Sequence, residues 1–212
     1  MNLDISKFNT SKITNMGSMF TFCQRLINLD LGSFDTTNVT KIEWMFNNCT
    51  NLRKLNLSNF KLDSLQYTEY MFSYYKNLTS LNLRNWNTPR LYRTDYMFIG
   101  CNRLSRLVLD SNIRLGSYPG LIGAPNDGQG FPEVDSPQIS RSGNWQEIKN
   151  DADISDRSNL IGNPLTADEL TKRYTGQNPG GGVHTYVWEP YYRGLRFVTN
   201  SPAVPVSKLE YL

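Results

Sequence analysis

The sequence predicts an α/β repeat solenoid: a right-handed, leucine-rich-repeat-like stack with a parallel sheet on one face and short helices on the other. The main observation is a period of 26 residues that runs through the first half of the chain without a slip. Leu29-Asp30-Leu31 returns as Leu55-Asn56-Leu57, and Met45-Phe46 returns as Met71-Phe72. A fixed period between 20 and 50 residues is typical of solenoids, in which each unit contacts only its neighbours.

The first half of each unit is expected to form a strand. It reads L-x-x-L-x-L, as from Leu52 to Leu57, and its last two leucines alternate with polar residues. Such alternation is the periodicity of a half-buried strand, and strands stacked in register form a parallel sheet. Polar residues then end the strand. One aromatic side chain per unit is expected to fold back inward: Phe8, Phe34, Phe60 and Trp86.

The second half of each unit predicts a short helix, because its apolar residues are three or four positions apart. In the second unit, Thr40 and Glu43 also have the spacing of a capping box. The segment is about ten residues long and rich in Asn and Thr, so a short α or 3₁₀ helix is expected. The apolar columns are Ile13, Met16, Phe20 and Cys23 in the first unit and Val39, Ile42, Phe46 and Cys49 in the second.

The chain divides into four expected parts. A repeat array over 1–110, truncated at its N-terminus, is followed by a last turn and linker over 111–142, where Gly, Pro, Asp and Ser are frequent. Residues 143–199 are expected to form a small β-rich capping module that shields the end of the core, and 200–212 an exit segment. Within the module we expect strands near 145–148, 183–188 and 195–199, and a helix over 167–174 with capping-box spacing at Thr166 and Glu169.

Composition limits the classes of partner. The net charge is +3, and the first 110 residues carry 13 Lys and Arg against 8 Asp and Glu. This excess is too small and too dispersed for a dedicated nucleic-acid binder. No apolar run approaches the roughly 18 residues of a membrane helix, so direct membrane insertion is not expected. The oligomeric state stays open.

The three cysteines occupy one column of the repeat. They are Cys23, Cys49 and Cys101, and Tyr75 takes the fourth place. An odd number of cysteines without a C-x-x-C pair argues against a zinc site or a disulfide framework. A ladder of small buried hydrophobic side chains is favoured, and a disulfide between Cys23 and Cys49 remains the alternative.

No residue pattern indicates catalysis, a metal site or a cofactor. His184 is the single histidine and has no nucleophile motif beside it, so a structural or exposed role is favoured. The glycine-rich segment 178–182 lacks the Lys-Ser/Thr of a phosphate loop. Asp151, Asp153 and Asp156 lack the Gly and Glu of a calcium-binding EF-hand.

Two surfaces are candidates for ligand binding. The first is the outward face of the expected sheet, where side chains project from strands about 4.8 Å apart. An ordinary soluble sheet face is the alternative interpretation. The candidate residues of this face are Arg53, Lys54, Asn56, Ser80, Asn82, Arg84 and Arg106.

The second surface is aromatic. The position of Ser18 lies opposite the apolar face of the expected helix, and later units place Trp44, Tyr70 and Tyr96 in this column. Exposed aromatic side chains at one-unit spacing are unusual on a monomer and suit carbohydrate stacking or a protein contact. The alternative is that they lie flat and seal the convex edge. Tyr67 and Tyr92 lie in flanking columns.

The repeat resembles that of a known family. The pattern L-D-L-x-x-F-D-T-x-N-V-T-x-I-x-x-M-F-x-x-C-x-x-L, from Leu29 to Leu52, closely resembles the repeat of BspA-like bacterial surface proteins. The third unit departs most, with Lys61, Leu62, Thr68 and Tyr75 in place of the usual residues. Segments 143–146, 165–170 and 185–190 are similar to the region that follows such repeats in Gram-positive surface proteins.

The resemblance implies a secreted protein displayed on a bacterial cell surface, with relatives that act as adhesins. Display is carried over from the resemblance, because no export or anchoring signal is visible in this sequence. The expected function is therefore an adhesin-type binding module that recognises a host or microbial protein or glycan through its repeats. A passive spacer that displays another module is the alternative, and an enzyme such as a wall hydrolase is disfavoured because repeats offer a surface and no cleft.

Overall fold

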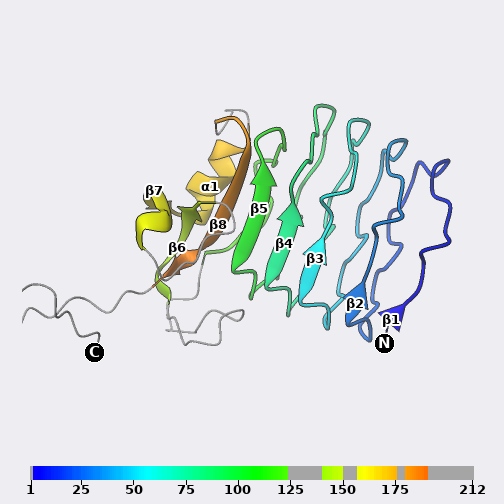
Figure 1. Cartoon of the computed structure of the whole chain (residues 1–212), viewed down its shortest axis with the longest axis horizontal. Helices are drawn as coiled ribbons and strands as arrows, with labels where there is room; N and C mark the ends of the chain where they lie inside the picture. The colour runs from blue at the N-terminus through cyan, green and yellow to red at the C-terminus, as the bar shows by residue number, and fades with distance from the viewer. Residues whose placement is uncertain (1, 124–139, 150–156, 176–179, 191–212) are drawn as a thin grey trace, which may run out of the picture.

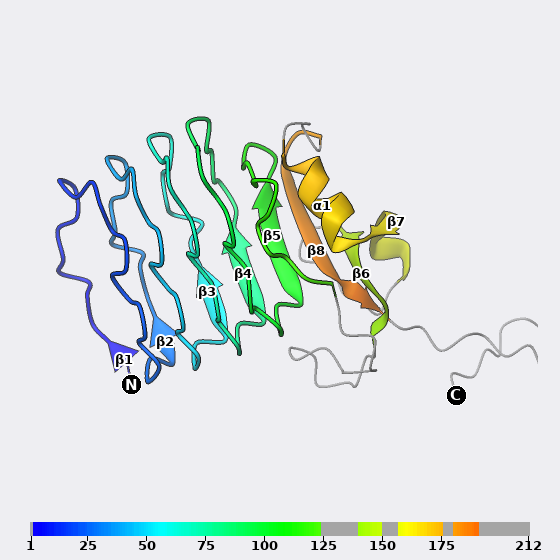
Figure 2. The ribbon, with the colours of Figure 1, turned by 180° about the vertical axis from the view of Figure 1, so that it is seen from behind.

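The computed structural model describes residues 2–123, 140–149, 157–175 and 180–190. The first of these ranges winds into a row of similar coils, one for each 26-residue unit, and the last three form a small module at the C-terminal end of the row (Figure 1). Seen from behind, the strands of successive coils lie side by side in chain order (Figure 2). The molecule is therefore a stack whose strands lie on one face, in a two-stranded sheet of β1 and β2 and a second sheet that begins at β3.

The strands of the coils are short, parallel and in register. They are β1 Asn2–Leu3, β2 Asn28–Leu29, β3 Lys54–Asn56, β4 Ser80–Leu83 and β5 Arg106–Asp110. Leu55 pairs with Leu81, which pairs with Leu107, so identical positions of successive units face each other. The strands predicted from the leucine pattern are confirmed, because buried leucines alternate with polar residues on β3 and β4, whereas Val108 is also buried on β5.

The predicted helices of the second half of each unit are absent. Segments 13–23 and 39–49 consist of turns, and single parallel bridges such as Lys41 to Tyr67 connect them to neighbouring units. Within the described residues the one α-helix, α1 Ala167–Arg173, lies outside the coils. The expectation of a leucine-rich-repeat-like α/β solenoid with helices on one face is therefore wrong, and the protein is built mainly on a mixed β-sheet.

The hydrogen bonds explain why turns replace the helix. Ile42 and Trp44 donate their backbone N–H groups to the next unit, at the carbonyls of Tyr67 (3.1 Å) and Glu69 (3.0 Å). The next residue, Met45, donates its backbone N–H to the carbonyl of Ile42 at 3.2 Å and closes a turn within the unit. A helix would direct all of these N–H groups to carbonyls of its own segment. The alternation satisfies the backbone and at the same time ties each unit to the next.

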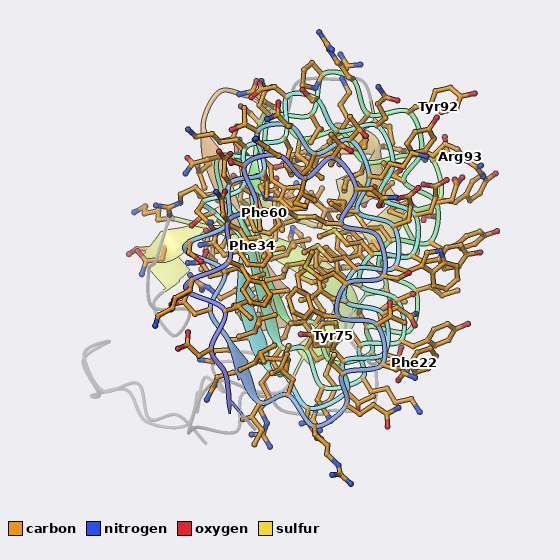
Figure 3. The ribbon with its side chains drawn as sticks, turned by 90° about the vertical axis from the view of Figure 1, so that its right-hand side faces the viewer. Phe22, Phe34, Phe60, Tyr75, Tyr92 and Arg93 are labelled. Carbon is orange, nitrogen blue, oxygen red and sulfur yellow. The ribbon has the colours of Figure 1, made fainter. Side chains whose placement is uncertain are left out.

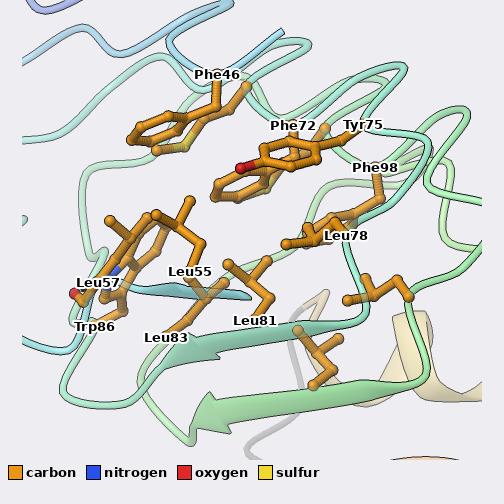
Figure 4. Close-up of a cluster of buried hydrophobic side chains, with 14 of the residues drawn as sticks. Phe46, Leu55, Leu57, Phe72, Tyr75, Leu78, Leu81, Leu83, Trp86 and Phe98 are labelled. Carbon is orange, nitrogen blue, oxygen red and sulfur yellow. Dashed lines mark hydrogen bonds between the residues drawn. The ribbon is translucent and has the colours of Figure 1, made fainter. Parts of the chain in front are cut away.

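The core is a single cluster that runs the length of the stack. Its axis is a ladder of parallel rings from Phe20, Phe46, Phe72 and Phe98, with centroids 5.5, 5.8 and 5.8 Å apart. Figure 4 shows the Phe46 and Phe72 rings on one side of this core and the leucines of β3 and β4 on the other. Apolar residues three or four apart thus mark the buried side of a series of turns as well as that of a helix.

The inward aromatic side chain predicted for each unit is confirmed for three of four. Phe34, Phe60 and Trp86 are buried, whereas Phe8 is 60% exposed. Ile13, which was also predicted in the core, is 37% exposed. Both residues belong to the first coil, where no described unit packs over their outer side.

The C-terminal module joins the sheet of the coils. It contains β6 Ser140–Ile148, the 3₁₀ turn η1 Arg157–Asn159, β7 Leu160–Leu165, α1 and β8 Val183–Pro190. Strand β8 pairs antiparallel with β5, which gives a six-stranded mixed sheet in the order β3-β4-β5-β8-β6-β7. The strands predicted near 145–148 and 183–188 are confirmed, and β7 was not predicted.

Helix α1 confirms the predicted capping box. Thr166 Oγ1 accepts the backbone N–H of Glu169 at 3.2 Å, and a Glu169 carboxylate oxygen accepts the N–H of Thr166 at 2.8 Å. Buried Leu170 and Tyr174 belong to the same core cluster as the coils, so the core is covered at this end. The predicted strand at 195–199, the exit segment 200–212, most of the linker and Asp151, Asp153 and Asp156 lie outside the described residues.

The cysteine column is a set of free thiols, and the alternative of a Cys23–Cys49 disulfide is not formed. The Cys49 and Cys101 thiols each donate a hydrogen bond of 3.0 Å to a carbonyl of the preceding unit, at Phe20 and Phe72. Burial raises the pKa of each of these two thiols to about 12. Cys49 and Cys101 thus serve as buried packing, which is the role favoured from the sequence, whereas Cys23 is only partly buried.

Candidate functional site

The predicted strand-face residues do not form one compact cluster. Lys54, Ser80 and Arg106 are direct neighbours across β3, β4 and β5. Arg53 precedes β3, whereas Arg84 follows β4 and aligns with Ser58 of the unit before. Five positions along a strand span about 16 Å, so Arg53 and Arg84 lie near opposite ends of this face.

Asn56 and Asn82 have a structural use on this face. Each accepts the backbone N–H two residues further on, from Ser58 at 3.1 Å and from Arg84 at 3.0 Å. This Asx turn ends the strand, and Asp30 and Asp110 make the same contact in other units. Their repetition is explained by turn formation without a ligand.

The predicted aromatic residues form a continuous ladder. The rings of Trp44 and Tyr70 stack with centroids 4.1 Å apart and planes 11° apart, and those of Tyr70 and Tyr96 with centroids 5.2 Å apart and planes 27° apart. We refer to these three residues as the aromatic ladder. Trp44 and Tyr96 remain 39% and 43% exposed. Their outward position is as predicted, although the helix from which it was inferred is absent.

The backbone of the ladder adopts a conformation that disfavours these side chains. Trp44, Tyr70 and Tyr96 have φ angles of 60°, 56° and 59°, as does Ser18 at 60° in the first unit. Each is the third residue of a turn, a position where positive φ usually selects Gly or Asn. An L-residue in this left-handed region costs roughly 1–2 kcal/mol. Bulky aromatic residues therefore occupy this column in spite of a local conformational cost.

An open groove with a volume of about 440 Å³ runs beside the aromatic ladder. It extends across the turn segments of four successive units. It lies on the side of the stack where Figure 3 shows Arg93 projecting outward, whereas Phe34, Phe60 and Tyr75 lie inside. Three columns line it. They are Asn15 and Arg93; Gly17, Glu43, Glu69 and Asp95; and Ser18 with Trp44, Tyr70 and Tyr96.

The groove carries more negative than positive charge. Its single lining cation, Arg93, contacts a Glu69 carboxylate oxygen at 3.0 Å and an Asp95 carboxylate oxygen at 3.7 Å. The second Glu69 oxygen, Oε2, is buried and accepts no hydrogen bond from the described residues. Glu43 has no ion pair with a described residue. The Glu43 carboxylate is thus left for a ligand to contact.

The capping box predicted for Glu43 with Thr40 is not formed, because segment 39–49 consists of turns, and Glu69 and Asp95 were not singled out in the sequence analysis. Glu43, Glu69 and Asp95 each precede a ladder residue by one position, so the same 26-residue period marks them. Because a helix was expected, positions one residue apart were assigned to different directions about its axis. In the turns they line one groove together.

His184 has a structural environment. Its Nδ1 lies 2.7 Å from a carboxylate oxygen of Glu147, which also binds Arg173 at 3.1 Å, and its Nε2 lies 3.3 Å from the Gly180 carbonyl. Among the described residues, no group of three or more His, Cys, Asp or Glu side chains is arranged to hold a metal ion. In that part of the chain there is also no helix of the length and apolarity that crossing a membrane requires.

Comparison with known proteins identifies the family. Residues 1–111 match the family described as "Mycoplasma protein of unknown function, DUF285", and the chain belongs to it. This family is associated with BspA-like proteins. No curated protein and no solved structure matches the chain.

Proposed function

We propose that the chain is an adhesin-type binding module of a bacterial surface protein, that it performs no catalysis, and that the groove along the aromatic ladder is its recognition site. The observation that carries this proposal is the ladder itself. In three successive units, a large aromatic side chain occupies the same left-handed backbone position beside an open groove. Backbone strain of this kind clusters at functional sites, because the fold tolerates it where a side chain is needed.

The surface chemistry of the groove supports binding. Exposed aromatic groups are enriched at interfaces, because a rigid ring buries much area and loses little conformational entropy. The carboxylates of Glu43, Glu69 and Asp95 lie next to these rings and supply directional acceptors. An apolar surface with a few placed polar groups is the usual composition of a ligand site.

Display at the cell surface is supported by resemblance and family. The 26-residue pattern from Leu29 to Leu52 resembles BspA-like surface proteins, and the DUF285 family is associated with them. An extracellular protein or glycan is the expected class of ligand.

The test is a binding screen against extracellular-matrix proteins, mucins and a glycan array at physiological salt. We expect a saturable interaction that the triple variant Trp44→Gly, Tyr70→Gly, Tyr96→Gly loses. Glycine is chosen because it tolerates the positive φ at these positions.

The matched control is the double variant Phe22→Gly, Tyr74→Gly. These residues are also exposed aromatics with positive φ, at 59° and 57°, but they do not line the groove. Equal loss of binding in the control and in the triple variant would contradict the site. An alanine variant of Arg53, Lys54, Arg84 and Arg106 tests the strand face in the same assay.

A passive spacer is the second candidate, and one observation favours it. Backbone hydrogen bonds connect successive units both through the strands and through the turn face, which makes the stack stiff along its axis. A spacer depends on length and not on particular side chains. Retention of whole-cell adhesion by the ladder triple variant would support the spacer and contradict the groove.

A further inference from the structure

The aromatic ladder presents one open ring face at its N-terminal end. Both faces of the Tyr70 ring are covered by stacking, on one side by Trp44 and on the other by Tyr96. The opposite face of Trp44 has no ring partner among the described residues. In the first unit the equivalent positions hold Ser18 and Gly17, in place of an aromatic and an acidic residue. The ladder therefore ends beside small residues.

A carboxylate stands beside this open face. A β-carbon built on Gly17 would lie 3.5 Å from Glu43 Oε2 and 3.3 Å from the Glu43 carbonyl oxygen. The Glu43 carboxylate thus extends toward the first unit, next to the free side of Trp44. In the following unit the buried Glu69 Oε2 accepts no hydrogen bond from the described residues. Both groups line the groove.

The charge and the shape of the groove together specify the ligand chemistry. The Glu43 carboxylate has no ion pair with a described residue, and a cation binds a carboxylate more strongly than a neutral hydroxyl group does. A cation over the face of Trp is further attracted by the ring quadrupole. Stacking within the ladder leaves few open ring faces, which disfavours an oligosaccharide that would need several of them. A planar guanidinium stacks on a ring and binds a carboxylate through two N–H groups.

The length of the groove points to a polypeptide. It crosses four units, a distance of about 14 Å at the usual strand spacing. An extended chain of roughly four residues spans this distance. Carboxylates recur in three successive units, at Glu43, Glu69 and Asp95.

We infer that the groove binds an extended, arginine-containing segment of a partner protein, with one guanidinium on the free face of Trp44 and within reach of the Glu43 carboxylate. This inference rests on the proposed function, since it names the ligand class of the same groove. The inference is narrower than the proposed function, because it excludes a neutral glycan as the main ligand.

The experiment measures the anisotropy of fluorescein-labelled five-residue peptides, titrated with the full chain. One peptide contains two arginines, and its matched control contains two citrullines, which keep the planar group and lose the charge. We expect the arginine peptide to bind at least about tenfold more tightly than the citrulline peptide, with affinity that falls as salt is raised. Glu43→Gln should weaken binding of the arginine peptide about tenfold or more, because it removes the charge beside the guanidinium. Glu69→Gln should have a smaller effect, because the Glu69 carboxylate is already paired with Arg93.

The control variant is Asp168→Asn, which makes the same change of charge on α1, away from the groove. It should bind the arginine peptide like the original chain. Equal affinity for the two peptides, or equal effects of Glu43→Gln and Asp168→Asn, would overturn the inference.

The screen of the preceding section separates the two proposals. Ladder-dependent binding of a neutral glycan, with no preference for arginine peptides, would overturn the arginine inference and leave the binding module standing. Absence of any ligand for the groove would overturn both. Unchanged urea unfolding of Glu43→Gln and Glu69→Gln is the check that these variants are folded.

Discussion

The indole ring of Trp44 and the phenol ring of Tyr70 stack face to face, with centroids 4.1 Å apart and planes inclined by 11°. The two residues are one unit apart in sequence, so this contact joins neighbouring coils at the surface. Phe46 and Phe72 join the same coils inside the core. These two coils are therefore held together by one exposed and one buried ring stack, and the coils of Tyr70 and Tyr96 are joined in the same way.

The exposed stack should contribute measurably to stability. In a double-mutant cycle with Trp44→Leu and Tyr70→Leu, we expect a coupling free energy of about 0.5–1.5 kcal/mol, the usual range for an aromatic pair. Urea unfolding of the four proteins measures it. Trp44 and Tyr92 share no ring partner, so their cycle is the control and should be additive within about 0.3–0.5 kcal/mol. Equal coupling in the two cycles would contradict a specific stack.

The positive φ of the aromatic ladder predicts an unusual order of stability for glycine and alanine variants. At Tyr70, with φ of 56°, glycine should give a more stable protein than alanine by about 1 kcal/mol, because alanine keeps the left-handed strain. The unfolding free energies of Tyr70→Gly and Tyr70→Ala test this. At exposed Lys76, where φ is not positive, alanine should be the more stable variant. If the alanine variant were more stable than the glycine variant at both positions, the positive φ described for Tyr70 would be contradicted.

The ring ladder of the core should dominate stability. Phe46 is fully buried between Phe20 and Phe72, so Phe46→Ala should lower the unfolding free energy by about 3–5 kcal/mol. Phe22 lies two residues after Phe20, the equivalent of Phe46 in the first unit, and is 63% exposed. Phe22→Ala should therefore cost less than about 1 kcal/mol. Thermal and urea unfolding measure the stability of the two variants. Similar losses of stability would contradict the different burial of Phe46 and Phe22.

The hydrogen bonds of Thr36 should also contribute to the free energy of unfolding. Its buried hydroxyl donates to the Lys61 carbonyl at 3.1 Å and accepts the Lys61 N–H at 2.8 Å. Thr36→Val keeps the shape but leaves the Lys61 groups without this partner, which should cost about 1–3 kcal/mol. Thr37 is exposed, so Thr37→Val should change stability by no more than about 0.5 kcal/mol. Equal effects in urea unfolding would show that the cross-unit bonds contribute little.

The buried thiols predict a loss of stability at alkaline pH. Burial raises the pKa of Cys49 and Cys101 from 9.0 to about 12. Between these values the thiols ionise in the unfolded chain while they stay protonated in the folded chain. The folded state then binds more protons, so the unfolding free energy decreases as pH rises from 9 toward 12 and is unaffected by these groups below 9.

Urea unfolding at several pH values tests this against the double variant Cys49→Ala, Cys101→Ala. The original chain should lose stability more steeply above pH 9, by at most about 1.4 kcal/mol per thiol for each pH unit. Parallel pH profiles would contradict the raised thiol pKa. As an independent readout, both thiols should resist iodoacetamide at pH 8 until the chain is unfolded.

Several features followed from local sequence pattern. The alternation in Leu55-Asn56-Leu57 was sufficient to identify a strand and its buried face, because the side-chain period of a strand is unambiguous. The constant period placed Trp44, Tyr70 and Tyr96 in one column. The cap of α1 was visible in Thr166 and Glu169, since a capping box depends on four neighbouring residues alone.

Other features depended on contacts between units. The spacing of Val39, Ile42, Phe46 and Cys49 is shared by a helix and by a run of turns, so the pattern could not distinguish them. Turns prevail because Ile42 and Trp44 bind carbonyls of the next coil, which an isolated segment cannot reveal. The charge excess of the groove likewise emerged only when Glu43, Glu69 and Asp95 were placed beside the rings.

The sequence by itself thus determined the repeat, the strands, the buried side of each coil and the column of exposed aromatic residues, because each depends on periodicity along the chain. Only the tertiary structure decided that the second face is made of turns, that the rings of Trp44 and Tyr70 stack, and that β8 extends the sheet from β5. These features arise from hydrogen bonds and packing between segments 25 or more residues apart, and a local sequence pattern contains no information on such contacts.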